Sequence, residues 1–180
     1  MGIIVSVLMG MALTAPISSA AIAAMIFVTS GANQEGLIIA SGAAVIGCST
    51  QMIGFAVQSR KDNNIGTIIS VAVGTSMLQF KNILKKPIIW LPTIIASAIL
   101  GPISTCWVHV ICMGSSAGMG TAGFVGQIGT ISSMLESGSD TWRIIVGIVG
   151  LQIILPAILV FFIDLLFRKF GLIKEGDLKI

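Results

Sequence analysis

The residue types best suited to binding chemistry gather in one glycine-rich stretch, residues 114–130. Glycine stands at every third position from Gly120 to Gly129, and hydroxyl and amide side chains are interleaved with these glycines: Ser115, Ser116, Thr121, Gln127 and Thr130. Hydroxyl and amide groups both donate and accept hydrogen bonds, and glycine allows a solute to approach the backbone closely. The stretch therefore predicts a site for a small polar solute.

The same stretch has a second interpretation, because small residues at regular spacing also let membrane helices pack closely. Each glycine destabilises a helix by nearly ~1 kcal/mol relative to alanine, so this density disfavours a plain helix. Non-helical backbone persists at membrane depth only where protein or a water-filled cavity satisfies its polar groups, and transporters use such breaks to bind solutes. We favour a binding segment that includes Gly120 and Gly123, with close packing as the alternative.

His109 is the only histidine and lies near the end of an apolar run. An ionisable group within a membrane span is a functional candidate, although a hydrogen bond to a neighbouring carbonyl explains it more simply. Cys106, His109 and Cys112 are spaced three apart, but no fourth ligand accompanies them. The chain also has no nucleotide-binding loop and no catalytic triad, so we expect no catalytic residue, no metal and no cofactor.

A polar loop follows the glycine-rich stretch and carries Glu136, Asp140 and Arg143. An ionised carboxylate accepts hydrogen bonds from solute hydroxyls, whereas the simpler alternative is a solvated loop whose charges pair with one another. We include Glu136 among the candidates. The full set of predicted binding residues is Ser115, Ser116, Gly120, Thr121, Gly123, Gln127, Thr130, His109 and Glu136.

The composition predicts that these residues are held by an all-α integral membrane protein. Only 9% of the residues are charged, against about 25% in soluble domains, and 55% are hydrophobic. No charged residue occurs in residues 1–34, 36–59 or 87–135, and each run reaches the roughly 20 residues that cross a bilayer. The basic residues stand at the ends of these runs, which favours a role in topology and not in nucleic-acid binding.

We expect one transmembrane domain over residues 1–180 with about four crossings: residues 2–30, 36–58, 87–112 and 144–167. The first contains Pro16, which removes a backbone donor and displaces the carbonyl of Ala12, so this crossing is predicted to be kinked or broken. Further prolines, Pro92, Pro102 and Pro156, lie within the later crossings. Some of the helices should therefore be kinked.

The distribution of basic residues predicts the topology. Nine of the ten fall into three groups: Arg60 and Lys61; Lys81, Lys85 and Lys86; and Arg168, Lys169, Lys174 and Lys179. Placing all three groups on the cytoplasmic side satisfies the positive-inside rule. Residues 65–80 and the glycine-rich stretch must then each enter and leave by one side, as re-entrant or interfacial segments. Both termini would face the cytoplasm.

Four strings resemble a known family: Leu-Thr-Ala-Pro-Ile-Ser-Ser-Ala-Ala-Ile (residues 13–22), Gly-Thr-Ser-Met-Leu-Gln (74–79), Ala-Ser-Ala-Ile-Leu-Gly-Pro (96–102) and the glycine string of residues 118–130. Together they resemble enzyme IIC-type membrane proteins of the bacterial sugar phosphotransferase system. The branch they resemble most includes members described as regulators of toxin genes. Members of that branch are longer, and this chain resembles their C-terminal half, as an internal start, a truncation or a split gene would produce.

The resemblance implies a multi-pass protein of the bacterial cytoplasmic membrane, in contact with lipid, that binds a sugar and transports it. A separate IIB protein, itself served by IIA, would phosphorylate the sugar, so this chain would be the membrane subunit of a phosphohistidine–sugar phosphotransferase without a phosphate carrier of its own. A homo-oligomer, or the missing N-terminal half, would complete it. The alternatives are a IIC-like regulator or sensor without transport, and a non-functional half-protein. The Gly-Ile-Thr-Glu-Pro string of sugar IIC proteins is absent, so Glu136 matches no motif.

Overall fold

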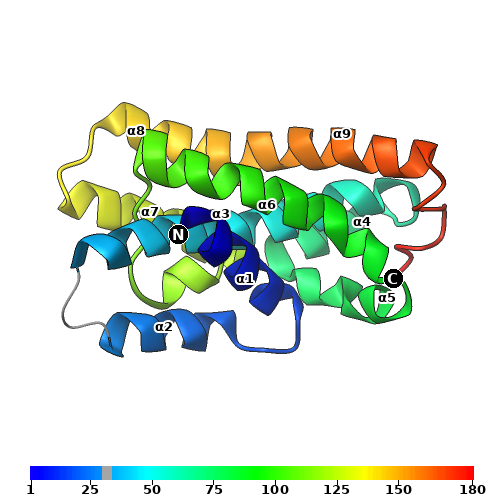
Figure 1. The fold of residues 1–180 in the computed structure, drawn as a ribbon, viewed down its shortest axis with the longest axis horizontal. Coiled ribbons are helices and arrows are strands. Elements are labelled where there is room, and N and C mark those ends of the chain that lie inside the picture. Colours follow the sequence, from blue (N-terminus) through cyan, green and yellow to red (C-terminus); the bar gives the residue numbers. More distant parts are fainter. Residues whose placement is uncertain (30–33) are drawn as a thin grey trace.

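The computed structural model describes residues 1–29 and 34–180, and it describes side chains outside residues 26–35. Every regular element within these residues is helical, and the elements lie roughly along one long axis (Figure 1). Together with the length and apolar composition of the longest helices, this confirms the predicted all-α membrane fold.

Three helical stretches among the described residues are long and apolar enough to cross a membrane: Gly36–Lys61, Pro87–Val108 and Thr141–Lys169. The first is α3 (Gln34–Gln58) continued by η1 (Ser59–Lys61), and the second joins η4 (Pro87–Trp90), α6 (Leu91–Ile103) and η5 (Ser104–Val108). The third joins α8 (Thr141–Ile145), η8 (Val146–Ile154) and α9 (Leu155–Lys169). With 26, 22 and 29 residues at about 1.5 Å each, all three exceed the ~30 Å hydrocarbon core.

The predicted first crossing is instead a helical hairpin, α1 (Gly2–Thr14) and α2 (Ser19–Thr29), so the described residues contain three crossing helices and not four. The backbone of Ala15 is extended just before Pro16, and Ser18 Oγ accepts a hydrogen bond from Ala21 N at 3.2 Å, which starts a new helix. The proline break was predicted correctly. The break does more than kink the helix, because it reverses the chain direction (Figure 1).

Two further hairpins occupy the positions of the predicted re-entrant segments, whose entry into the membrane stays a prediction. The first hairpin, residues 65–85, runs through α4 (Ile65–Ile69), η2 (Ser70–Gly74), η3 (Ser76–Gln79) and α5 (Phe80–Lys85). The second hairpin, residues 114–136, runs through η6 (Gly114–Gly118), η7 (Ala122–Phe124) and α7 (Val125–Glu136). Each returns to the end of the molecule where it began, as a hydrogen bond from Met113 N to Ser133 Oγ demonstrates for the second.

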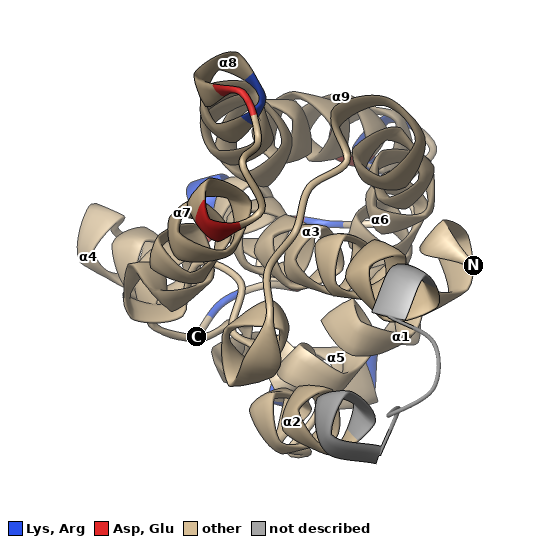
Figure 2. Cartoon of the chain, turned by 90° about the vertical axis from the view of Figure 1, so that its left-hand side faces the viewer, with Lys and Arg blue, Asp and Glu red and all other residues tan. Residues whose placement is uncertain are grey.

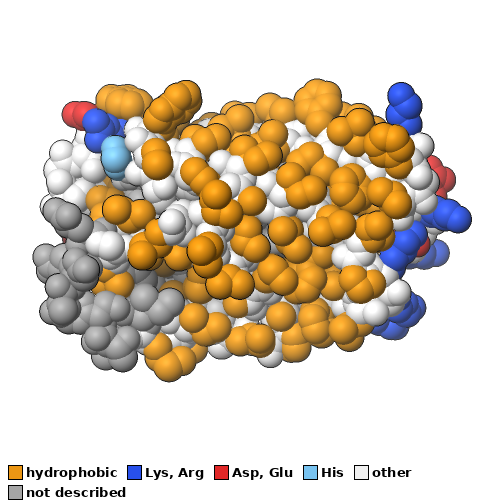
Figure 3. All heavy atoms as spheres, in the orientation of Figure 1, with side chains coloured by type: hydrophobic (Ala, Val, Ile, Leu, Met, Phe, Trp, Pro, Cys, Tyr) orange, Lys and Arg blue, Asp and Glu red, His pale blue; other side chains and the backbone are white. Residues whose placement is uncertain are grey.

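Charged side chains separate to the two ends of the long axis, with an apolar belt between them (Figure 3). Nine of the ten basic residues and four acidic residues (Asp62, Asp164, Glu175 and Asp177) lie at one end, which we call the basic end and which carries a net charge of +5. The opposite end carries Glu136, Asp140 and Arg143, on α7 and around the start of α8 (Figure 2). This is the charge distribution of a protein that crosses a bilayer.

The two chain ends lie apart (Figure 1). Residues 173–180, which we call the C-terminal strap, lie across the basic end, where Leu178 is fully buried and its carbonyl accepts hydrogen bonds from Asn63 and Gln79. Gly2 packs against Gly101 and Thr105, in the half of α6 away from the basic end. Met1 therefore lies apart from the C-terminal strap, and the prediction that both termini face the cytoplasm stays a prediction.

Candidate functional site

The tips of the two re-entrant hairpins meet inside the molecule. Thr121 Oγ1 of the second hairpin donates a hydrogen bond to the carbonyl oxygen of Ala72, near the tip of the first, at 2.5 Å. The turn before η7 requires glycine at position 120, where φ is +55° and a Cβ would lie 2.7 Å from the backbone of Cys48 and Ser49 in α3. The glycine string therefore allows the second hairpin to enter the helix bundle.

The break between α1 and α2 reaches the same place. Ser19 Oγ donates to the carbonyl oxygen of Gly118 at 2.6 Å, and a Cβ on Gly118 would lie 2.4 Å from the Ser19 carbonyl oxygen. Thr14 Oγ1, at the end of α1, lies 2.9 Å from Ser76 Oγ of the first hairpin. Three chain reversals thus converge, at residues 15–18, 74–76 and 119–122, and we call this region the three-tip junction.

A hollow of about 220 Å³ opens at the three-tip junction. Its polar lining comes from Ser18, Ser19 and Thr75, and none of the described ionisable side chains lines it. The Ser18 and Thr75 hydroxyls accept hydrogen bonds from Ala21 N and Met77 N, and each still has a proton to donate. The first backbone N–H groups of α2 have no partner within the helix because the helix starts there. The hollow therefore offers neutral donors and acceptors without a fixed charge.

A buried amide, Gln51 of α3, links the elements around the junction through hydrogen bonds. Its Oε1 accepts hydrogen bonds from Thr93 Oγ1 at 2.9 Å and from Trp90 Nε1 at 3.1 Å, both on the η4–α6 span, and from Thr14 Oγ1 at 3.5 Å. Thr14 in turn contacts Ser76. One side chain thus connects α1, α3 and α6 with the first hairpin, which fixes the position of the hairpin tip.

The structure brings only part of the predicted binding set to this junction. Gly120 and Thr121 form the tip of the second hairpin, although the side chains that line the hollow belong to their neighbours Met119 and Ala122. Ser116 and Glu136 line a separate groove of about 310 Å³ beside α7, together with Ser132 and Ser133. The predicted residues therefore lie along the whole second hairpin and not around one site.

Gln127 and Thr130 are buried within the bundle. Thr130 Oγ1 donates to the Gly126 carbonyl at 2.7 Å and accepts from Gln152 Nε2 at 3.0 Å, which supports helix packing. The Gln127 amide is 6% exposed, and neither of its polar atoms has a hydrogen-bond partner in the described part of the chain. Among the predicted binding residues that the structure describes, Gln127 is the one whose buried side-chain polar atoms lack any hydrogen-bond partner.

Ser115, Gly123 and His109 are exposed and do not line the hollow, although Gly123 directly follows Ala122 of the junction. His109 has a left-handed backbone, with φ at +54°, where η5 ends. Cys106 is exposed whereas Cys112 is buried, and no group of three His, Cys, Asp or Glu side chains comes together within the described residues. Their spacing in the sequence does not translate into a shared site.

Sequence reasoning missed Ser18 and Thr75 as lining residues. Both follow a helix break, Ser18 after Pro16 and Thr75 after Gly74, and both cap the next helical turn. Their signal in the sequence is that of ordinary capping residues. The hairpins and the break that bring them together are more than 40 positions apart, so no local pattern marks them as neighbours.

A comparison with protein-family models supplies independent information. The model described as "Phosphotransferase system, EIIC" matches residues 1–180, which include all three tips of the junction. No curated protein and no solved structure matches this chain.

Proposed function

Because this chain belongs to the EIIC family of the phosphotransferase system, we propose that it is the membrane component that binds a sugar at the three-tip junction and carries it across the bilayer. A separate cytoplasmic IIB protein, served by IIA, phosphorylates the sugar. The family match agrees with the resemblance to enzyme IIC proteins found in the sequence, and membership of the toxin-regulator branch stays a prediction.

The observation that carries this proposal is the neutral, hydroxyl-bearing lining of the hollow. Ser18, Thr75 and the free amides at the start of α2 supply donors and acceptors for sugar hydroxyls, and Ile17 and Met119 supply apolar surface for the C–H face of the ring. At about 220 Å³, the hollow is smaller than the ~300–1,000 Å³ typical of sites for drug-sized ligands. Its size therefore favours a single sugar ring.

We place the basic end in the cytoplasm of a bacterial cell, following the positive-inside rule. The first hairpin then enters from the cytoplasmic side and the second from the outside, so the hollow lies where access from the two sides meets. Discontinuous helices whose ends point at a central site are a recurring arrangement in transporters. The C-terminal strap and residues 60–64 would face the cytoplasmic partners.

In the phosphoryl transfer that follows, the phosphorus–nitrogen or phosphorus–sulfur bond to the partner's residue breaks. A bond to a sugar hydroxyl oxygen forms, and the hydroxyl proton is released. This chain contributes positioning, which by itself lowers the barrier of such reactions substantially. Its only histidine, His109, follows the end of the second span away from the basic end, so we assign the phosphate carrier to the partner.

Sugar binding by purified protein, measured calorimetrically across common monosaccharides, tests the proposal. We expect dissociation constants from micromolar to millimolar, about −4 to −8 kcal/mol. Thr75→Val should weaken binding about tenfold through a lost hydrogen bond of ~1.4 kcal/mol, whereas Thr75→Ser should bind normally. Thr141→Val, exposed at the opposite end, is the matched control.

Equal sugar binding by the wild type and Thr75→Val would show that the sugar does not bind in the hollow. Binding without uptake in cells that contain the IIA and IIB partners would favour the regulator. We expect uptake to require a homo-oligomer or a co-expressed N-terminal half, because the chain resembles the C-terminal half of its family members. Absence of binding to every sugar would contradict the proposed function.

A further inference from the structure

A second hollow, the lateral groove, lies on the apolar belt between α3, the first hairpin and α9. It measures about 500 Å³, and nearly all of its lining is apolar, from Ile53 and Val57 of α3, Ile68 and Ala72 of the first hairpin, and Ile158 and Phe162 of α9. Phe162 is 60% exposed and Ile158 45% exposed, so the groove opens towards the surrounding membrane. A groove of this kind suits a hydrocarbon chain and not a sugar.

One charged residue, Arg60, lies among the lining residues, where α3 passes into the basic end. Its guanidinium sits 4.5 Å above the Phe161 ring, and its Nη1 donates to Asp164 at 2.7 Å and to the Val57 carbonyl at 2.9 Å. These contacts hold the side chain in place. Its Nε and Nη2 have no acceptor within the described part of the chain, and the side chain is 23% exposed.

We propose that the lateral groove binds one acyl chain of an anionic phospholipid, whose headgroup phosphate accepts hydrogen bonds from Arg60 Nε and Nη2. Guanidinium groups bind phosphate oxygens through paired N–H donors. The net charge of +5 at the basic end favours an anionic lipid over a zwitterionic one. The proposal requires only that the chain resides in a membrane, and it does not depend on sugar transport.

The position of the groove connects the lipid to the three-tip junction. Ala72 lines the groove, and its carbonyl accepts the hydrogen bond from Thr121. An acyl chain packed against Ile68 and Ala72 therefore contacts the same segment of the first hairpin that holds the second hairpin. Occupancy of the groove should stabilise the contact between the two tips.

The test measures lipid retained by the intact protein. Wild-type protein is reconstituted into bilayers of equal phosphatidylcholine and phosphatidylglycerol, extracted in a mild detergent and analysed for bound lipid by mass spectrometry. We expect phosphatidylglycerol to exceed phosphatidylcholine about fivefold, as for one favourable contact between a basic group and an anionic headgroup. Equal retention of the two lipids, or no retained lipid, would overturn the proposal.

Variants separate the two parts of the site. Ala157→Phe places a ring in the lateral groove and should abolish retention, whereas Ile99→Phe on the exposed face of α6, outside the groove, should retain lipid as the wild type does. Arg60→Gln should keep lipid but lose the preference for phosphatidylglycerol. Full retention of lipid by Ala157→Phe would overturn the groove as the binding site. An unchanged preference for phosphatidylglycerol in Arg60→Gln would overturn the headgroup contact.

Discussion

Thr14 Oγ1 and Ser76 Oγ lie 2.9 Å apart in the interior, although 62 positions separate the two residues. Either hydroxyl can be the donor: when the single Thr14 proton points to the carbonyl of Gly10 in its own helix, Ser76 donates to Thr14. The contact joins the last turn of α1 to the first hairpin just beyond its tip. The helix break at Pro16 and the hairpin tip are thus held in one position relative to each other.

A double-mutant cycle on this pair should show energetic coupling. Thr14→Val and Ser76→Ala are each expected to lower the free energy of unfolding by ~1–3 kcal/mol, because each leaves a buried hydroxyl without its partner. The double variant should lose less than the sum, with a coupling of about 1 kcal/mol. Unfolding in mixed detergent micelles measures these values. Strictly additive effects would contradict the contact.

Gly120 and Gly138 provide a matched comparison for the second hairpin. Both have positive φ, +55° and +70°, but a Cβ on Gly120 would collide with the backbone of α3, whereas Gly138 faces open space. Gly138→Ala should cost only the ~1–2 kcal/mol of a left-handed alanine. Gly120→Ala should cost clearly more and should also weaken sugar binding. Equal thermal shifts for the two variants would show that the second hairpin does not pack so closely against α3.

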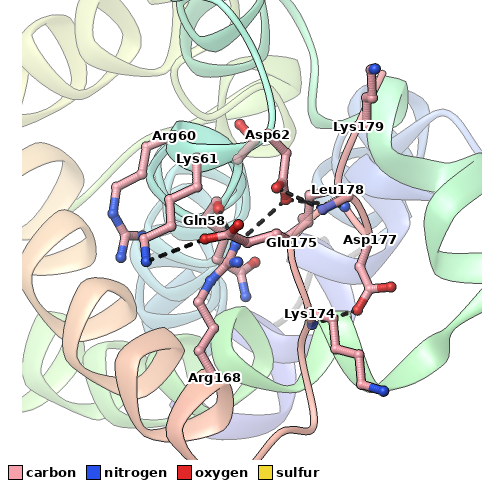
Figure 4. A network of polar contacts seen from close by, with 12 residues as sticks. Gln58, Arg60, Lys61, Asp62, Arg168, Lys174, Glu175, Asp177, Leu178 and Lys179 are labelled. Carbon is pink, nitrogen blue, oxygen red and sulfur yellow. Dashed lines mark hydrogen bonds and ion pairs between the residues drawn. The ribbon is translucent and has the colours of Figure 1, made fainter.

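The attachment of the C-terminal strap should depend on pH through Asp177. Partial burial raises the pKa of the Asp177 carboxyl. Hydrogen bonds from Lys86 Nζ and Lys174 N lower this pKa, and their combined effect outweighs that of burial, so the net pKa lies below its usual value. A carboxyl whose pKa falls on folding stabilises the folded form above the unfolded pKa, near 4. This contribution disappears as the pH falls through the lowered pKa. The polar network around the strap is shown in Figure 4.

Limited proteolysis at neutral pH, and hydrogen exchange between pH 5 and pH 3, would measure the strap's attachment. Asp177→Asn should loosen the strap at neutral pH and remove the part of the pH dependence that Asp177 contributes. Glu175→Gln is the control, because Glu175 is 78% exposed and makes only a long ion pair of 3.9 Å with Lys61. Equal loosening of the strap in Asp177→Asn and Glu175→Gln would show that the loss of any negative charge loosens it, and not the loss of the Asp177 contacts.

Cysteine labelling tests the proposed orientation. In a Cys106→Ser background, which removes the one exposed native thiol among the described residues, Lys85→Cys marks the basic end and Asp140→Cys the opposite end. An impermeant reagent added outside intact cells should label the Asp140→Cys protein alone. The basic end should be protected because positive residues are retained on the cytoplasmic side. Labelling of Lys85→Cys from outside would show that the orientation is the reverse of the one proposed.

Charge distribution made the membrane fold and the positions of the two later hairpins predictable, because basic residues must stay out of the lipid wherever the chain crosses it. Pro16 predicted the break in the first apolar run, but it carried no information on the angle between α1 and α2. That angle depends on Ser19, Thr14 and their distant partners, Gly118 and Ser76.

The candidate site was less predictable, for a physical reason. The glycine string identified the second hairpin because backbone strain leaves a signature in residue type, as at Gly120. The hollow is made by three separate reversals, and two of them present only serine and threonine caps, Ser18 and Thr75. Caps are common at helix starts, so only the tertiary arrangement distinguishes these two from the others.

The C-terminal strap has a consequence for biogenesis. Leu178 fills the space beside Phe55, Val71 and Ile83, and its carbonyl binds Asn63, 115 positions earlier in the chain. Such distant contacts form late, because a long loop must close before they contribute. We therefore expect the first hairpin to lack its packing against Leu178 until residues 173–180 have been synthesised, so that its apolar base is left uncovered during that interval.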